Sequence, residues 1–494
     1  MNKKIDSILI QENSTIKEAM ECIDKSGLRI VLIVDKNKKL LGVTTDGDIR
    51  RAFLSGKNLD TQIKEIMIQN PITALEDTPA TELLETMLEK GIQEIPLVDN
   101  RGVLVDIVLL RELKSIPLSS PDITHKEVEI INQVLSTPFL SIGPRVKEFE
   151  KKLANYIDTK YAIAVNSGTS GLHLCIRSLD IKDGDEVITT PFSFIASANC
   201  MLFERAKPVF VDIDENTLCI DVSKIEEKIT AKTKAILPVH IFGHPCEMDK
   251  ITEIARHHNL TIIEDACEAL GAEYKGKRVG SFGEASVFSF YPNKPLTTSE
   301  GGVVVTNNEE MARLCQSMRN QGRDETGTWL RHVRLGYNYR MPELCAALGV
   351  VQMERIDEIL EKRQRVADFY NERLGKIDGI KIPYIAPNVK VSWFVYVIRL
   401  DEKKFSREDR NKTIQELENR GINCRDYFPS IHLEPFYVEM FGYKRGDFPT
   451  TEMISDSTIA LPFYNNLTEE EVNYICDSLR NIIESYGRGT YKEQ

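Results

Sequence analysis

The sequence predicts an α/β protein in which a repeated N-terminal module precedes a larger part built on a mainly parallel sheet. Two observations support this prediction: one pattern occurs twice near the start, and from about residue 122 apolar runs alternate with amphipathic helical patterns. Continuous apolar runs separated by such helices are typical of a parallel sheet covered on both faces. With 494 residues, the chain is long enough for two or three domains.

The repeat occupies residues 14–49 and 78–113. Gly27 matches Gly91 and Asp35 matches Asp99, in each case 64 residues later. Each copy begins with a helical pattern and continues with a strand, a turn containing Asp and a second strand. Two copies of a small unit usually pack together because neither can bury its apolar face alone. A connector rich in proline and serine, residues 114–121, follows the repeat.

Composition and charge narrow the class of protein. The net charge of −12 disfavours nucleic-acid binding, since no local basic patch stands out. No signal peptide and no membrane span are expected. The ten cysteines are scattered and no Cys-x-x-Cys pair occurs, which favours a cytoplasmic protein without a disulfide framework or zinc site. His257 and His258 are adjacent, and because neighbouring helix positions point apart, we expect a solvated helix there and not a metal site.

Polar segments follow several of the predicted strands, where parallel sheets bind their ligands. The strands predicted in the larger part are Tyr161–Val165, Glu186–Thr189, Pro208–Ile213, Ala235–Val239, Thr261–Glu264, Ala285–Phe290 and Gly302–Thr306. The turn after the first, in Val165–Leu174, is rich in serine, threonine and glycine. It can bind a phosphate with helix N-terminal amides, or it can be an ordinary helix cap.

Two ionisable residues stand at later strand ends. Asp265 can pair with a structural cation, or it can hold a protonated heterocyclic nitrogen. Lys294 lies in a Thr/Ser/Gly-rich loop between two apolar strands, where a lysine with a lowered pKa could form a Schiff base; a lysine on a surface turn is the alternative. A long helix with apolar residues from Leu344 to Ile356 is expected to lead into a smaller C-terminal domain.

The order of these segments, together with the loop around Asn338 and the segment Tyr427–Tyr437, resembles the DegT/DnrJ/EryC1/StrS family of nucleotide-sugar aminotransferases. The resemblance runs from about Ile116 to about Arg480. It implies a type I aminotransferase fold with a pyridoxal phosphate-binding large domain (116–374) and a small C-terminal α/β domain (375–494). The repeat in residues 1–115 resembles a tandem CBS-domain pair, or Bateman module.

The resemblance also implies roles for individual residues. Lys294 would form a Schiff base with pyridoxal 5'-phosphate, Asp265 would pair with the ring nitrogen, and Phe194 would stack on the ring. Gly168, Thr169, Ser170 and Ser289 would bind the cofactor phosphate. Asn338 would reach the cofactor of a neighbouring subunit, which implies a homodimer with shared active sites, or a higher oligomer.

The resemblance assigns three further residues to the substrate or to the ring oxygen of the cofactor. Tyr291 and His432 would contact the substrate, although a core or capping role for His432 is an open alternative. Glu268 stands where the family usually has Gln or His near the ring oxygen, and an ionised carboxylate there would repel a phenolate unless it is protonated or turned away.

The implied reaction is transamination. Family members that dehydrate the sugar carry a His in place of the lysine, so Lys294 favours amination of a nucleotide-linked keto sugar, most often a 4-keto-6-deoxy hexose, with glutamate as amino donor. Such reactions serve polysaccharide biosynthesis. The alternative is a regulatory ligand-sensing protein built on an aminotransferase scaffold.

In the N-terminal module, the resemblance assigns a nucleotide ligand to Thr45 and Asp48. A module that only packs or dimerises is an equal alternative. The second copy has Leu109 and Glu112 at the corresponding positions, so we expect at most one competent nucleotide site.

Overall fold

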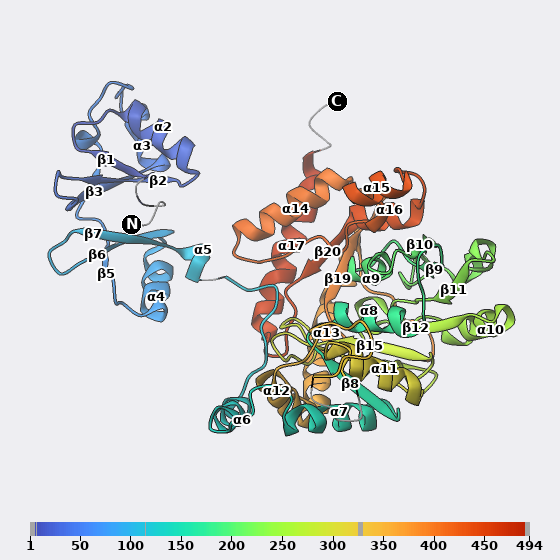
Figure 1. Cartoon of the computed structure of the whole chain (residues 1–494). Helices are drawn as coiled ribbons and strands as arrows, with labels where there is room; N and C mark the ends of the chain where they lie inside the picture. Colours follow the sequence, from blue (N-terminus) through green and yellow to red (C-terminus); the bar gives the residue numbers. More distant parts are fainter. Residues whose placement is uncertain (1–4, 6, 114, 325–329, 490–494) are drawn as a thin grey trace. The chain divides into compact units, whose positions relative to one another are not determined.

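In the computed structural model, the described residues are 5, 7–113, 115–324 and 330–489. The chain forms two compact units, one up to Ser115 and one from Ile116 onwards, apart from the short stretch Asn419–Gly421 (Figure 1). Each unit has hydrophobic clusters of its own. None of the described helices is long and apolar enough to cross a membrane.

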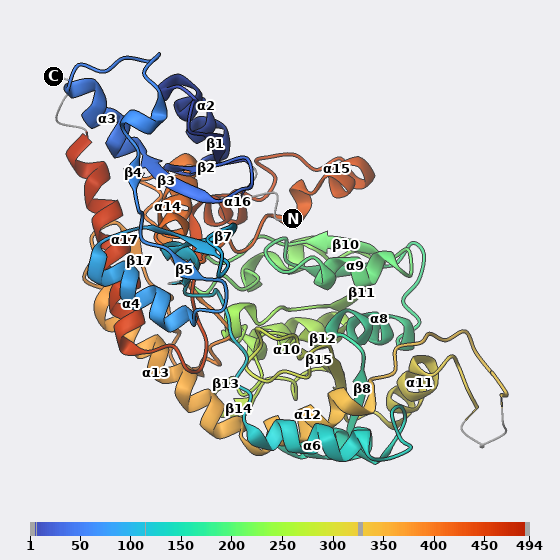
Figure 2. The same ribbon diagram turned by 90° about the vertical axis from the view of Figure 1, so that its left-hand side faces the viewer.

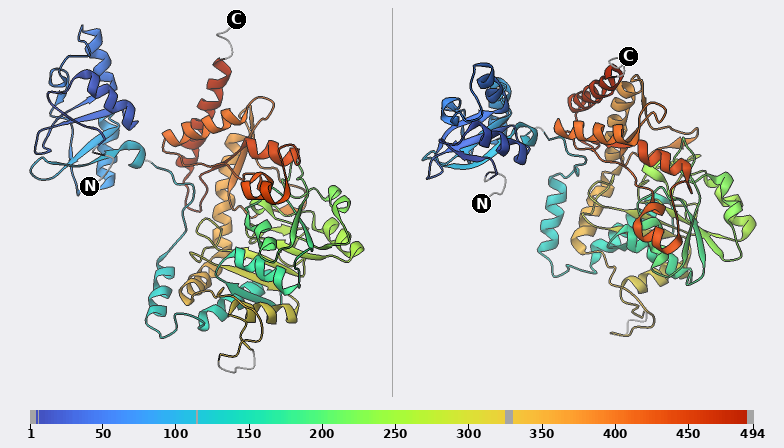
Figure 3. Two further views of the ribbon diagram at one scale, coloured as in Figure 1. Left: turned by 45° about the horizontal axis from the view of Figure 1, so that its top comes forward. Right: turned by 90° about the horizontal axis from the view of Figure 1, so that it is seen from above.

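The first unit consists of two copies of the same set of elements, which Figures 1 and 3 show in blue. Three elements of the second copy begin and end 64 residues after their counterparts. The pairs are α2 (Ile16–Ser26) and α4 (Ala80–Lys90), β2 (Ile30–Val34) and β6 (Glu94–Val98), and β3 (Leu40–Thr45) and β7 (Leu104–Leu109). The matched glycines Gly27 and Gly91 end their helices with φ of 68° and 65°, a conformation that glycine adopts without strain.

The two copies join through their hairpin turns. The amide of Leu40 donates to the carbonyl of Gly102 at 3.2 Å, and the amide of Leu104 donates to that of Lys38 at 3.0 Å. One apolar cluster draws on both copies, with Leu32 from the first and Ile107 from the second. Each copy also has a cluster of its own, so the two copies share one part of their core and bury the rest separately. The remaining elements are β1 (Leu9–Gln11), α3 (Asp46–Leu54), η1 (Ile63–Glu65), β4 (Ile68–Gln69), β5 (Ala74–Leu75) and α5 (Leu110–Leu113).

The second unit is built on a seven-stranded sheet with the order β10-β9-β11-β12-β15-β16-β8. Neighbouring strands run parallel from β10 to β15, whereas β16 is antiparallel to both of its neighbours. The strands are β8 (Tyr161–Val165), β9 (Glu186–Thr189), β10 (Lys207–Phe210), β11 (Thr233–Ile236), β12 (Thr261–Asp265), β15 (Ala285–Ser289) and β16 (Gly302–Thr306). The predicted strands are all present, with small differences at their ends.

Helices cover both faces of this sheet (Figures 1 and 2). On one face of β16, Val303 and Val305 pack in a hydrophobic cluster with residues of α7 and α12. On the other face, Val304 packs in a cluster with residues of α8 and α11. Alternation of this kind follows from the two-residue period of a strand. The helices around the sheet are α6 (His125–Leu135), α7 (Pro144–Ile157), α8 (Gly168–Ser178), α9 (Ala196–Leu202), α10 (Met248–His258), α11 (Glu309–Arg319) and α12 (Glu343–Glu354).

A smaller antiparallel sheet, β17-β19-β20, lies in the C-terminal part of the second unit. Its strands pack against the long helices α13 (Ile356–Leu374) and α17 (Glu469–Gly489) in a cluster of their own. Other elements are η2 (Val222–Lys224), η3 (Glu226–Lys228), η4 (Ile241–Gly243), β13 (Glu273–Tyr274), β14 (Lys277–Arg278), β17 (Ile380–Lys381), β18 (Val389–Lys390), β19 (Tyr396–Leu400), α14 (Arg407–Asn419), η5 (Ile431–Leu433), α15 (Pro435–Phe441), α16 (Pro449–Ser457) and β20 (Thr458–Leu461). A division of this unit after residue 374 stays a prediction.

The long helix predicted from Leu344 onwards is in fact two helices, α12 and α13, separated at Arg355. Arg355 is buried, and its guanidinium binds the carboxylates of Asp122 and Glu127 at 3.1 and 2.6 Å. The local apolar spacing could not reveal this break, because its partners lie more than 200 residues away in the sequence.

Candidate active site

A cavity of about 530 Å³ lies at the edge of the seven-stranded sheet where β8, β12 and β15 end. Eight of the predicted site residues line it: Gly168, Thr169, Phe194, Asp265, Glu268, Ser289, Tyr291 and Lys294. The other lining residues are Ser167, Leu172, Ser193, Ala196, Ser197, Val239, Cys267, Asn293, Glu300, Phe394, Tyr427 and Phe428. The carboxyl ends of the strands thus gather residues that are up to 261 positions apart, from Ser167 to Phe428.

The N-terminus of α8 forms one wall of the cavity. Ser167 is the N-cap, and its hydroxyl accepts the amide of Ser170 at 3.1 Å. Within the described part of the chain, the amides of Gly168 and Thr169 have no acceptor. A Cβ on Gly168 would lie 2.9 Å from both Cys267 Sγ and Ser289 Cβ, so only glycine fits where the turn approaches β15. Unsatisfied amides at the positive end of a helix, with hydroxyls beside them, suit a phosphate group.

Asp265, the last residue of β12, is buried beside the cavity. Its Oδ2 accepts the Ser197 hydroxyl at 2.6 Å, and its Oδ1 accepts the amide of Cys267 at 3.1 Å. Ser197 in turn lies 2.7 Å from the hydroxyl of Ser193. These two serines, on and just before α9, fix the carboxylate without neutralising it. No local sequence pattern predicts them, since the contact between Ser197 and Asp265 joins positions 68 residues apart.

Lys294 enters the cavity from the loop between β15 and β16. Its Nζ lies 3.4 Å from Glu268 Oε1 and 3.6 Å from the centroid of the Phe394 ring. The ammonium is largely shielded from water, with 12% of the side chain exposed. A carboxylate and an aromatic face are the groups that stabilise a shielded cation. Lys294 is therefore not a lysine on a solvated surface turn.

Glu268 is buried and bridges two elements. Its Oε1 faces Lys294, and its Oε2 accepts the amide of Phe242 at 2.9 Å. Burial raises the pKa of this carboxyl, although the nearby ammonium of Lys294 opposes the rise. A raised pKa enlarges the protonated fraction, which relieves the repulsion expected between this residue and an oxygen anion of a bound ring.

Arg363, on α13, binds the backbone next to Lys294 and the backbone of Phe394, whose ring faces the Lys294 amine. Its Nη2 donates to the carbonyls of Asn293 at 3.0 Å and Phe394 at 3.3 Å, and its Nη1 donates to Asn465 Oδ1 at 3.1 Å. The side chain is buried, and burial lowers the pKa of its guanidinium. Sequence reasoning did not single out Arg363, because the regular helical pattern of α13 does not distinguish it from its charged neighbours.

Ser170, Asn338 and His432 do not line the cavity. The hydroxyl of Ser170 lies 2.9 Å from that of Ser167, behind the turn. Asn338 is exposed on the loop before α12. His432 is completely buried and bonds Glu452 at 3.0 Å through Nε2, and burial lowers its pKa. The structure favours the core interpretation of His432 over substrate contact.

Thr45 and Asp48 in the first unit bond to each other. The amide and hydroxyl of Thr45 donate to Asp48 Oδ2 at 2.8 and 2.6 Å, which forms a capping box at the start of α3. Burial alone would raise the pKa of Asp48, but the hydrogen bonds from Thr45 and Arg51 lower it. In the second copy, Leu109 is buried, and the side chain of Glu112 lies outside the described residues.

The groups around the cavity fit pyridoxal phosphate. The α8 turn offers free amides for the phosphate, Asp265 offers a fixed carboxylate for a protonated ring nitrogen, and Lys294 offers the amine. The exposed ring of Phe194 lies at the same cavity.

Comparisons with known proteins agree with this fit. The profile of the DegT/DnrJ/EryC1/StrS aminotransferase family matches residues 121–480, and that of the CBS domain matches residues 1–55 and 63–118. GDP-perosamine synthase of Escherichia coli O157:H7 is 38% identical over 372 residues, which cover 75% of this chain and 99% of that enzyme. The spore coat polysaccharide biosynthesis protein SpsC of Bacillus subtilis is 37% identical, covering 74% of this chain and 97% of SpsC.

A solved structure of a sugar aminotransferase is also similar to this chain. The putative sugar aminotransferase Spr1654 of Streptococcus pneumoniae, in its PLP form, superposes with a TM-score of 0.72 at 30% identity, and the match covers 75% of this chain and 99% of that protein. The predictions of the fold class and of the cofactor are confirmed. The chain therefore belongs to the DegT/DnrJ/EryC1/StrS aminotransferase family, as a pyridoxal phosphate-dependent aminotransferase of the type I fold that carries a pair of CBS domains at its N-terminus.

Proposed function

We propose that the protein transfers an amino group from glutamate to the keto group of a nucleotide-linked sugar, a 4-keto-6-deoxy hexose, in polysaccharide biosynthesis. The observation that carries this proposal is the convergence of Lys294, Asp265 and the α8 turn on one cavity. The names of the E. coli and B. subtilis relatives, a perosamine synthase and a spore coat polysaccharide protein, support the sugar and its pathway.

The residues of this chain divide the catalytic work among them. When bound, pyridoxal phosphate supplies an electron sink for the pair left behind when the substrate carbon loses a proton. Asp265 keeps the ring nitrogen protonated, because an adjacent carboxylate favours the cationic form of that nitrogen. Ser197 holds the carboxylate in place from the other side. The amine of Lys294, held beside Glu268 and the Phe394 ring, would act as the general base that takes up the proton of the substrate carbon and later gives it back.

The phosphate is held by the α8 amides with Thr169 and Ser289, and Ser170 acts indirectly by fixing the Ser167 cap. Asn338 is exposed, and its neighbours Tyr337 and Tyr339 stack on each other at 4.8 Å. Both tyrosines contact His173 of α8, so the loop is held with Asn338 facing outward. This placement supports a homodimer in which Asn338 reaches the partner's cofactor.

The polar lining of the cavity supports a sugar ketone as amino acceptor. Lys294 is the only lysine or arginine among the described lining residues, while Glu268, Glu300, Tyr291 and Asn293 present oxygens and an amide. Polar oxygens and an amide suit the hydroxyl groups of a sugar ring.

The test combines one variant with a substrate panel. Lys294→Ala is expected to lose the visible absorption band of lysine-bound cofactor, together with its shift on borohydride treatment, and to lower turnover by at least about 10⁴-fold. Wild-type protein, given glutamate and a panel of UDP-, GDP- and dTDP-linked keto sugars, should yield one product whose mass shows replacement of oxygen by an amine. An unchanged band in Lys294→Ala would overturn the role of the lysine, and no aminated product would overturn the substrate class.

The CBS pair favours a second candidate, a regulatory protein that senses a ligand on the aminotransferase scaffold. The half-reaction with glutamate separates the two: conversion to the pyridoxamine form supports the enzyme, and no conversion supports the sensor. A nucleotide bound through Thr45 and Asp48 as a regulator of activity, and the cytoplasmic location, stay predictions.

A further inference from the structure

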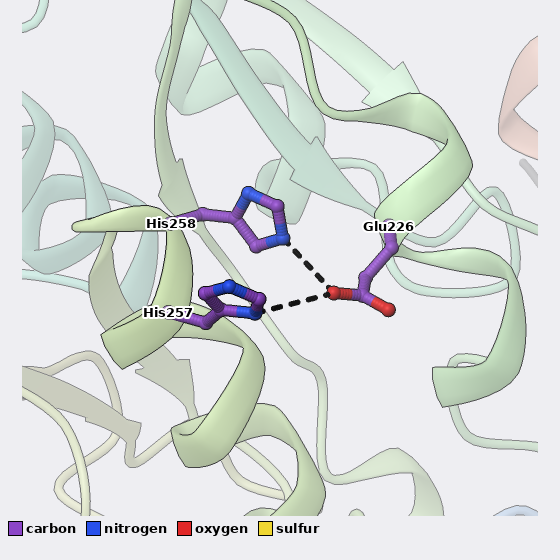
Figure 4. Close-up of side chains that lie close together, drawn as sticks. All are labelled: Glu226, His257 and His258. Carbon is purple, nitrogen blue, oxygen red and sulfur yellow. Dashed lines mark hydrogen bonds and ion pairs between the residues drawn. The ribbon is translucent and has the colours of Figure 1, made fainter.

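Three potential metal ligands converge on the outside of the second unit, and none of them lines the active-site cavity. Glu226 opens the short helix η3, and His257 and His258 are the last two residues of α10 (Figure 4). His258 Nε2 lies 2.9 Å from Glu226 Oε1, and His257 Nδ1 lies 4.0 Å from the same oxygen. One ligand atom from each residue falls within 4.8 Å of the other two.

His257 and His258 are exposed, as expected for a solvated helix, but both approach the same carboxylate oxygen. Consecutive residues of a helix point about 100° apart, and for that reason His257 and His258 were predicted to form only a solvated face. At the end of α10 they use different nitrogens, Nδ1 of His257 and Nε2 of His258, and the two ring centroids lie 4.9 Å apart. Figure 4 shows both rings directed at the Glu226 carboxylate.

We propose that Glu226, His257 and His258 bind a divalent transition metal ion of the zinc type. Two imidazole nitrogens and one carboxylate oxygen are a common protein donor set for zinc, with water completing the coordination. Calcium and magnesium prefer sites made of oxygen alone, so the two histidines select against them. Bonds of about 2.0–2.2 Å from zinc to its ligands place tetrahedral ligand atoms about 3.3–3.5 Å apart. This value lies between the distances of 2.9 and 4.0 Å from Glu226 Oε1 to the two histidine nitrogens.

The electrostatic surroundings also favour a cation. The negative end of the α10 dipole lies at its last turn, where the two histidines stand, and it attracts positive charge. With both imidazoles neutral, the carboxylate of Glu226 gives the three ligands a net charge of −1. The competing interpretation is an exposed hydrogen-bonded pair of Glu226 and His258, but such a pair leaves the approach of His257 to the same oxygen unexplained.

Both elements that carry the ligands are anchored in the core. Ile225, next to Glu226, is completely buried, and the amide of Ile229 donates to the Glu226 carbonyl at 3.1 Å. Helix α10 is anchored by Ile251 and Ala255. The backbone positions of the ligands therefore exist before the metal binds, which lowers the cost of ordering them. A bound ion would join η3, in the connection between β10 and β11, to α10.

The test is a zinc titration of the full-length, cofactor-loaded protein from which any affinity tag has been removed. Calorimetry should detect one zinc ion per chain, and zinc should raise the unfolding temperature because the metal binds the folded state. Removing a group that merely orients a metal ligand weakens binding 10–100-fold, so His257→Ala, His258→Ala and Glu226→Gln should each weaken zinc binding by at least about tenfold. His125→Ala, which removes an exposed histidine from α6, should leave binding unchanged.

Two results would overturn the proposal: no zinc binding at millimolar zinc, or binding that all three variants leave as strong as in the wild type. Glu226 and His257 are largely exposed and His258 is partly exposed, so their substitution is expected to leave the fold intact, which circular dichroism checks. The outcome does not depend on the sugar specificity, because transamination by the three variants in the absence of zinc should equal that of the wild type.

Discussion

Two strand-to-helix turns of this chain look alike in sequence but differ in what they can bind. One follows β8 and begins α8; the other follows β3 and begins α3. In both, a hydroxyl side chain caps the helix: Ser167 accepts the amide of Ser170, and Thr45 accepts the amide of Asp48. A hydroxyl and a glycine at such a turn predict a phosphate site in either place.

The difference lies in what already occupies the first turn of the helix. At α3, the carboxylate of Asp48 binds back to Thr45, and the amide of Asp46 donates to the carbonyl of Arg29. At α8, the first turn has no acidic residue, and the described part of the chain offers no acceptor to the amides of Gly168 and Thr169. An acid at the third helical position satisfies the helix from within, and its absence leaves the helix open to an external anion.

Alanine at the glycine of each turn tests this contrast most strongly. In Gly168→Ala, the new Cβ meets Cys267 and Ser289 at 2.9 Å, so we expect the affinity for pyridoxal phosphate to fall about 10–100-fold, equivalent to about 1.4–2.8 kcal/mol. In Gly47→Ala, the nearest atoms lie at 3.5 Å, and alanine should stabilise α3 by up to about 1 kcal/mol. Cofactor titration of the apoenzymes measures the first effect and thermal unfolding the second. Equal cofactor affinity in both variants and the wild type would contradict the contrast.

A second change concerns the geometry of Lys294. Arg363→Lys keeps the charge but cannot reach the carbonyls of both Asn293 and Phe394, so the loop should shift slightly. A small misplacement of reacting groups can lower the rate about 10²-fold, and we expect kcat to fall 10- to 100-fold with a smaller change in KM. Arg365→Lys is the matched control, since that exposed neighbour has, among the described residues, a hydrogen bond only to the carbonyl of Asn465. A change in stability alone, with kcat preserved, would assign Arg363 a purely structural role.

These residues also show which features of the fold and the site could be predicted from the sequence and which could not. The offset of 64 residues between the two copies was predicted correctly because its signal is local: glycines at helix ends, aspartates in turns and a constant spacing. The positions of Asp265, Glu268 and Lys294 at or after the ends of buried strands were also predicted, because the apolar runs before them are local signals. Ser197, Phe394 and Arg363 were not, because each reaches the site through contacts with residues 68 or more positions away. The break at Arg355 likewise depends on carboxylates that lie in α6 and before it.

The third prediction uses pH. Because the folded-state pKa of Glu268 is raised above its ordinary value of 4.5 by burial, the stability that this residue contributes is greatest at low pH and is lost as the pH rises through the folded-state pKa. Lys294 opposes the rise and Asp265 adds to it. The side chain of Glu268→Gln cannot ionise. The unfolding temperature of this variant minus that of the wild type, both measured as apoenzyme, should therefore increase as the pH rises from roughly 5 to 8. Glu300→Gln, at an exposed acid of the same cavity, serves as control. A difference that is constant across this range would show that burial does not perturb Glu268.

The smallest effect is expected at the α3 turn, where the hydroxyl acts as a helix cap. Thr45→Val removes the hydroxyl that accepts the amide of Asp48, and loss of such a cap costs about 1 kcal/mol. Denaturant unfolding should show this loss in the first unit, while the half-reaction with glutamate keeps its wild-type rate. Calorimetry of the full-length protein with adenine, guanine, cytidine and uridine nucleotides then separates the two roles of the turn. Nucleotide binding that disappears in Thr45→Val would show that the turn binds an external ligand despite its internal cap. No binding by the wild type would leave the cap as the whole function of the turn, since Asp48 then occupies the place that we propose for the cofactor phosphate at α8.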